Sequence, residues 1–178
     1  MEMDVDELQD FVNDAMANGW PGNTVPRTDA DFPGFYGGNY RSGQWRCLDV
    51  WSGATTDAGM VVVFFKESPS WTCVYRGGIL RGNRHLEQTS VEENELFGFL
   101  IEALHSPQDA VFRLRGPSEF ASGDLRWRYE FSLKGDIESF IATEQIYENG
   151  TLAYERVLMG GCIGDGVSYA PEACRLWS

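Results

Sequence analysis

Apolar residues recur with a helical period in two segments of the chain. In residues 8–16, LQDFVNDAM, and in residues 96–104, LFGFLIEAL, apolar side chains stand at positions i, i+3, i+4, i+7 and i+8. This spacing places them on one face of an amphipathic helix. Each segment follows a stretch rich in Asp, Glu and Asn, which suits the positive end of a helix dipole. The pattern therefore predicts two helices.

After each helical segment the pattern changes to a period of two. Residues 127–133, WRYEFSL, alternate apolar and polar side chains, as a half-buried strand does. Asn149-Gly150 is typical of a type I′ hairpin turn, and Ser68-Pro69-Ser70 breaks the chain at the matching place of the first half. We therefore expect each half to hold one helix and about four antiparallel strands, with Trp45 and Trp127 pointing inward.

The two halves also share landmarks at similar spacings. A Trp-Arg pair, a glycine eight residues past the Trp, and a later double glycine occur in both halves, in the same order. This recurrence indicates an α+β domain that spans residues 1–178 and is internally duplicated. Each copy would be a helix-plus-four-strand unit, and the antiparallel sheets of the two copies would be related by a pseudo-twofold. Copy one covers about 6–80, copy two about 92–163, and a C-terminal tail, 164–178, is expected to fold back with Trp177 over an edge.

The composition favours a folded, acidic protein. Hydrophobic residues make up 43% of the 178 and aromatic residues 13%, which is enough to pack a core. The net charge of −13 repels phosphate backbones, so direct nucleic-acid binding is not expected. The basic residues are twelve arginines and two lysines, a bias that leaves a halophile-like protein and an ordinary acidic protein both open.

Targeting and metal signals are missing from the sequence. The first residues, MEMDVD, lack the basic and apolar regions of a signal peptide, and the longest apolar run, 60–65, is too short to span a bilayer. We therefore expect a cytoplasmic protein without membrane contact. The four cysteines form no Cys-x-x-Cys pair, and the chain has two histidines, so we expect no metal site and no cofactor.

Two acidic residues stand at positions that the strand pattern places on an inward face. Asp49 lies among apolar neighbours, and its counterpart in the second copy is Phe131. Glu144 likewise lies among apolar residues, and its counterpart in the first copy is Val61. An ionised carboxylate on an inward face is costly unless it is paired or hydrogen-bonded. We therefore predict that both acids are buried and that at least one faces a cavity.

Three interpretations of these acids remain open. Each acid pairs with an arginine, with Arg115 and Arg46 as candidates, and fastens the two halves together. Alternatively, the acids line an aromatic pocket for an amine or another cationic ligand. In the third interpretation, two carboxylates in unlike environments serve as general acid and base, for a reaction and catalytic residues that the spacing leaves unknown. The candidate ligand-binding residues are Asp49, Glu144, Trp51, Trp71, Tyr75, Tyr154 and Arg115.

Landmarks across nearly the whole chain resemble a known family. In the first half they are Phe11, Ala15, Asp49, Gly53, Gly59, Pro69-Ser70-Trp71, Tyr75 and Gly77, and in the second half Arg115-Gly116-Pro117, Glu144, Ile146, Asn149-Gly150, Tyr154-Glu155, Gly160-Gly161 and Ile163. With them the chain resembles DUF5680, a domain of unknown function found alone or joined to helix-turn-helix regulators of the Xre type. The resemblance implies a sensing role and no established chemistry.

These observations lead to one functional hypothesis and two alternatives. The leading hypothesis is a non-enzymatic domain that binds or senses a small molecule. The alternatives are an enzyme that uses the paired carboxylates and a dimeric protein-interaction module, with a homodimer left open. The three differ in what they require of the structure, because a deep aromatic pocket with an acid favours binding, a perturbed carboxylate pair favours catalysis, and a flat apolar patch favours interaction.

Overall fold

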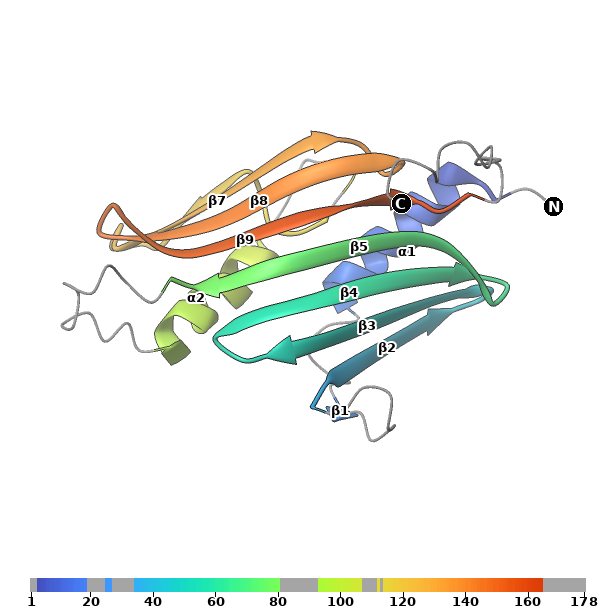
Figure 1. Cartoon of the computed structure of the whole chain (residues 1–178). Helices are drawn as coiled ribbons and strands as arrows, with labels where there is room; N and C mark the ends of the chain where they lie inside the picture. Colours follow the sequence, from blue (N-terminus) through green and yellow to red (C-terminus); the bar gives the residue numbers. More distant parts are fainter. Residues whose placement is uncertain are drawn as a thin grey trace, which may run out of the picture.

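The computed structural model describes residues 3–18, 25–26, 34–80, 93–106, 112 and 114–164. Within these residues two helices and nine strands follow one another (Figure 1). The elements are α1 (Val5–Asn18), β1 (Val25–Pro26), β2 (Tyr36–Ser42), β3 (Trp45–Gly53), β4 (Thr56–Phe65), β5 (Ser68–Ile79), α2 (Glu93–His105), β6 (Glu119–Ala121), β7 (Trp127–Gly135), β8 (Ser139–Glu148) and β9 (Thr151–Cys162).

All nine strands belong to one antiparallel sheet, in the order β1-β2-β3-β4-β5-β9-β8-β7-β6. The prediction of an internally duplicated helix-plus-four-strand unit with separate sheets is therefore wrong. The two halves join where β5 pairs with β9, from Trp71 opposite Cys162 to Ile79 opposite Tyr154. This pairing satisfies the backbone N–H and C=O groups that two separate sheets would leave at their edges. The expected return of the tail and the position of Trp177 lie outside the described residues.

Both helices cover the same face of the sheet and leave the other face open (Figure 1). The ring of Phe11 on α1 stacks on Trp45 of β3 at 5.5 Å, and the ring of Phe99 on α2 stacks on Trp127 of β7 at 5.9 Å. The prediction that both tryptophans point inward is thus confirmed. Each helix covers its own apolar cluster, and the cluster under α1 extends to β4, β5 and β9.

The hairpin between β8 and β9 follows its local sequence. Asn149 and Gly150 both have a positive φ, 48° and 79°, which is the backbone of a type I′ turn. The turn places Tyr147 opposite Leu152, and a β-bulge beside this pair shifts the register so that Ile146 lies opposite Tyr154 on the helix-covered face. Among the described helices, none is long and apolar enough to cross a membrane.

Candidate functional site

A cavity of about 80 Å³ lies on the helix-covered face, against the end of α1. Its wall combines residues of α1, four strands of the first half, the segment before β6, and β9. The lining residues are Ala15, Met16, Gly38, Asn39, Tyr40, Cys47, Asp49, Trp51, Asp57, Val61, Cys73, Tyr75, Leu114, Arg115, Arg156 and Leu158. A volume of this size has room for roughly five water molecules or a small organic group.

Of the two carboxylates that line this cavity, Asp49 has its negative charge balanced least by neighbouring groups. It lies on β3 opposite Val61, and its Oδ1 accepts a hydrogen bond of 2.8 Å from the Tyr75 hydroxyl. Among the described residues, no other hydrogen bond reaches its carboxylate. Burial raises the pKa of Asp49 to about 6, and the Tyr75 hydrogen bond and the charges of Arg156 and Arg115 only partly offset this effect. Asp49 therefore changes its protonation state close to neutral pH.

A second acid of the cavity, Asp57, is fully paired. The Nη2 of Arg156 lies 2.7 Å from each oxygen of the Asp57 carboxylate, and both side chains are largely buried. Asp57 on β4 and Arg156 on β9 are separated by β5, where the residue between them in register is Gly77. A Cβ on Gly77 would lie 2.7 Å from the Arg156 Cβ, so the glycine gives the arginine room to cross the strand. The Arg156 Nε is buried and has no hydrogen-bond partner.

A similar gap lets Tyr75 reach Asp49. Gly59 of β4 lies between Trp51 and Tyr75 in register, and a Cβ on it would come within 2.4 Å of the Tyr75 hydroxyl. The tyrosine therefore lies over the glycine and points across β4 toward β3. Interior strand glycines usually weaken a strand, and such positions often mark a close approach by another group. Here the approaching group is the one hydrogen-bond donor described at Asp49.

Glu144 has the opposite environment to Asp49. Its side chain has no exposed surface, and its carboxylate accepts hydrogen bonds from Arg115 Nε and Nη2 at 2.9 and 3.0 Å and from the hydroxyls of Tyr129 and Tyr154 at 3.0 Å. Burial alone would raise the pKa of Glu144, but the Arg115 charge and hydrogen bonds outweigh it and lower the pKa. Glu144 therefore stays ionised, and its hydrogen-bonding capacity is taken up within the protein.

The structure brings together four of the seven candidate ligand-binding residues. Asp49, Trp51, Tyr75 and Arg115 line the cavity. Glu144 and Tyr154 lie behind Arg115 as its ion-pair partner and as a donor to that partner. Trp71 is a core residue whose Nε1 donates to the Ile137 carbonyl at 2.9 Å. The prediction that both acids are buried is confirmed for Glu144, whereas Asp49 is partly buried; Asp49 is the acid that faces the cavity.

Sequence reasoning missed Asp57, Arg156 and Tyr40. Arg156 stands in the apolar alternation of β9, between Tyr154 and Leu158, and this charged residue at an inward position is the signal that could have identified it. Its guanidinium lies over the Tyr75 ring, 5.0 Å from the centroid. The Tyr40 hydroxyl hydrogen-bonds Asp14 of α1, so it links the helix to the cavity wall.

The two thiols at the cavity are poorly suited to nucleophilic chemistry. Burial raises the pKa of both Cys47 and Cys73 to about 12, and the nearby Asp49 charge adds to the effect. Both thiols therefore stay protonated at neutral pH. No group of three or more His, Cys, Asp or Glu side chains within the described parts of the chain could hold a metal ion.

Comparison with known families places the chain in one of them. A family model for DUF5680, a domain of unknown function, matches residues 49–163, which is more than half of the chain. The match begins at Asp49 and includes Asp57, Tyr75, Glu144 and Arg156. Searches of the curated proteins and of the solved structures found no match. The family model alone establishes the relationship: the chain belongs to the DUF5680 family.

Proposed function

We propose that the cavity beside Asp49 binds a small organic molecule that carries one positively charged amine, and that the protein works as a binding or sensing domain. The observation that carries the proposal is a partly buried carboxylate that faces a cavity and receives one described hydrogen bond. A ligand ammonium group at this place would supply the missing opposite charge and two or three further hydrogen-bond donors.

The balance of charges around the cavity supports a single positive charge on the ligand. Arg156 pairs with Asp57, and Arg115 pairs with Glu144, so these four groups cancel in pairs. Ionised Asp49 then leaves one negative charge in a region of low polarity. A monocation restores neutrality, whereas a carboxylate ligand would place a second negative charge beside Asp49.

The apolar and aromatic part of the wall supports an organic ligand. Trp51 and Tyr40 lie at the cavity, and aromatic faces attract ammonium groups that approach within about 6 Å. Val61, Leu114 and Leu158 provide apolar surface for a short carbon skeleton. A few converging polar groups on a mostly apolar wall are typical of small-molecule sites.

Catalysis by paired carboxylates has less support from the geometry. General acid–base chemistry needs a partner that can gain or lose a proton near neutral pH. Glu144 is held in the ionised form by Arg115, and its two oxygens already accept four hydrogen bonds. Asp49 alone keeps a pKa in the useful range.

A thermal-shift screen tests the proposal. Primary, secondary and quaternary amines would be compared with neutral molecules of the same skeleton that carry a hydroxyl or methyl group in place of the amine. We expect amines to raise the melting temperature of the parent, because a ligand that binds the native state stabilises it by mass action. The same amines should leave the melting temperature of Asp49→Asn unchanged. The matched control is Asp10→Asn, which removes an exposed carboxylate of α1 and should respond as the parent does.

The pH dependence of the affinity for an amine found in the screen provides a further test of the proposed ligand class. A cation prefers ionised Asp49, so its affinity should weaken by about tenfold for each pH unit below about 6, as measured by titration calorimetry. Neutral molecules that bind as tightly as the amines, or affinity that strengthens as the pH falls, would contradict the proposed ligand class.

A further inference from the structure

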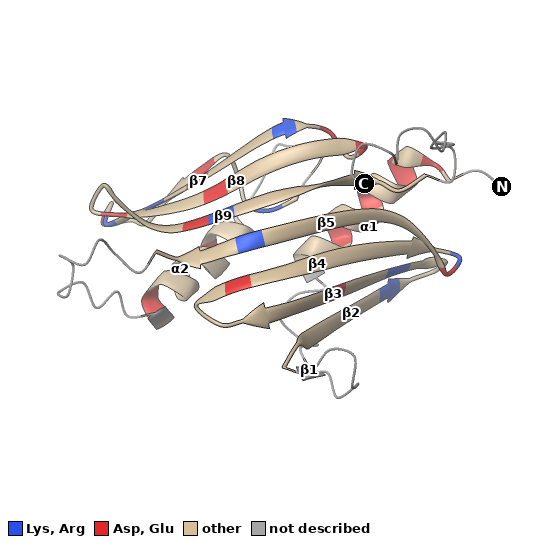
Figure 2. Cartoon of the chain, viewed as in Figure 1, with Lys and Arg blue, Asp and Glu red and all other residues tan. Residues whose placement is uncertain are grey.

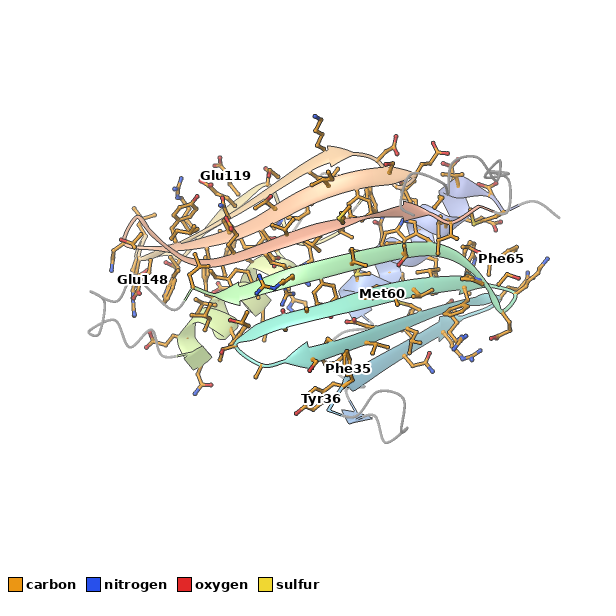
Figure 3. The ribbon with its side chains drawn as sticks, viewed as in Figure 1. Phe35, Tyr36, Met60, Phe65, Glu119 and Glu148 are labelled. Atoms are coloured by element: carbon orange, nitrogen blue, oxygen red, sulfur yellow. The ribbon has the colours of Figure 1, made fainter. Side chains whose placement is uncertain are left out.

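The open face of the sheet carries a continuous apolar row. Val50, Met60, Val74, Met159 and Ile141 are successive partners in register across β3, β4, β5, β9 and β8. The last four of these residues are exposed by 44%, 41%, 52% and 56%. Figure 3 labels Met60 near the middle of the sheet. The row therefore crosses the centre of the face that neither helix covers (Figure 1).

Neighbouring rows widen this strip into a band. On one side lie Leu48 and Val62, which are partners in register, and on the other lie Ala58 and the 46% exposed Val157. With strands about 4.8 Å apart and residues of one face about 6.6 Å apart along a strand, the nine residues of the band cover about 300 Å². The largest exposed apolar patch of a folded chain often has this size and is often a site of interaction. We call these residues, together with the row, the open-face band.

Charged residues lie around the band and, at Arg76, within it between Ala58 and Val157 in register. By strand alternation the described strands place five basic and three acidic residues on the open face: Arg41, Arg46, Arg76, Arg128, Lys134, Glu119, Glu130 and Glu155. Figure 2 colours the basic and acidic positions along the ribbon. The described residues of this face therefore carry more positive than negative charge, whereas the net charge of the chain is −13. An apolar centre with a polar rim is the usual anatomy of a protein–protein interface.

We propose that two copies of this chain form a symmetric dimer by packing their open-face bands against each other. The band spans five strands, about 24 Å, which is wider than one helix of about 10 Å diameter can cover. Another sheet covers such a width, since two sheets pack face to face about 10 Å apart with interdigitated side chains.

The area of the open face meets the requirement of a stable dimer. The seven long strands, β2–β5 and β7–β9, offer a face of roughly 1,000 Å² from the spacings of strands and residues. A standard interface buries about 800 Å² on each partner. Met60 and Met159 lie in the band, and their flexible side chains adapt to the opposing surface. The dimer would leave the cavity, on the other face, accessible to ligand.

The test compares the mass of the parent with that of two double variants by sedimentation equilibrium, from low micromolar to submillimolar concentration. We expect the parent to approach twice the monomer mass. Met60→Lys with Met159→Lys should remain monomeric, because each copy would bury two charges. The control, Ile101→Lys with Leu125→Lys, alters exposed apolar residues outside the band and should dimerise as the parent does. Both variants make the net charge less negative by two, so general charge repulsion cannot explain a difference between them.

A second measurement needs no variant. Hydroxyl-radical oxidation of Met60 and Met159 should fall as the parent concentration rises, while oxidation of Met3, near the start of α1, stays constant. Oxidation of the two band methionines that is high at every concentration, or a dimer that survives Met60→Lys with Met159→Lys, would overturn the proposal. Protection of both methionines in a monomer would overturn it too, because another segment of the same chain would then cover the band.

Discussion

Replacing Asp49 by Asn is expected to stabilise the ligand-free protein at neutral pH. A pKa of about 6 against an ordinary 3.8 means that ionised Asp49 costs the folded state about 3 kcal/mol. Asn removes the charge and keeps an oxygen that can accept the Tyr75 hydrogen bond. Because Asp49 is only partly buried, solvent screens part of this penalty, and we expect a gain of about 1–3 kcal/mol. This gain corresponds to about 2–4 °C in melting temperature for each kcal/mol in a chain of this size.

The direction in which stability changes with pH follows from the raised pKa of Asp49. The folded-state pKa of Asp49 lies above the unfolded value, so the folded state holds the proton more tightly, and the parent loses stability as the pH rises from about 3.8 to about 6. The advantage of Asp49→Asn should therefore be complete above about pH 6 and absent near pH 4. Melting temperatures of the parent, Asp49→Asn and the control Asp10→Asn, measured across this range, provide the test. An Asn variant that melts at or below the parent at neutral pH, with a difference that does not change with pH, would refute the reasoning.

Three further changes test the surroundings of the cavity. Glu144→Gln removes the carboxylate that pairs with the buried Arg115 charge. It should lower the free energy of unfolding, measured in urea, by about 3–5 kcal/mol, and a loss below about 1 kcal/mol would contradict the pairing. Gly59→Ala inserts a methyl group against a tyrosine hydroxyl and a backbone carbonyl and should cost about 1–3 kcal/mol in the same assay, whereas an unchanged midpoint would argue against the close approach. Cys47 and Cys73, with pKa values near 12, should resist alkylation in the native state and react on unfolding, and rapid labelling of native protein would show that they are accessible.

The local elements could be predicted because their signals are local. The period of α1 and α2, the alternation around Trp127 and the Asn149-Gly150 turn each depend on residues close in sequence. The joining of β5 to β9 could not be predicted in this way. Its partners, such as Trp71 and Cys162, lie about ninety residues apart, and a pairing of that kind leaves no periodic mark in either strand.

The inward placement of the two acids was predictable, but their unlike environments were not. Inward apolar neighbours on a strand indicate that Asp49 and Glu144 face the helix-covered side, whatever their partners are. Which arginine reaches which acid depends on the register between distant strands. Arg156 crosses β5 to Asp57 because Gly77 leaves a gap between them. The sequence pattern treats such a glycine as a turn or bulge, since nothing nearby shows that another side chain passes over it.

The contrast between the two acids is the reason for choosing Asp49 as the centre of the proposed site. Glu144 is surrounded by every donor that a buried carboxylate needs, so stability alone accounts for it. Asp49 lies on the same face with one described hydrogen bond, opposite Val61 and next to a cavity. A fold selected only for stability would place an apolar or amide side chain at this position, because either avoids the cost of the ionised carboxylate. The destabilising choice at Asp49 is therefore the reason for proposing that a positively charged ligand group compensates it when bound.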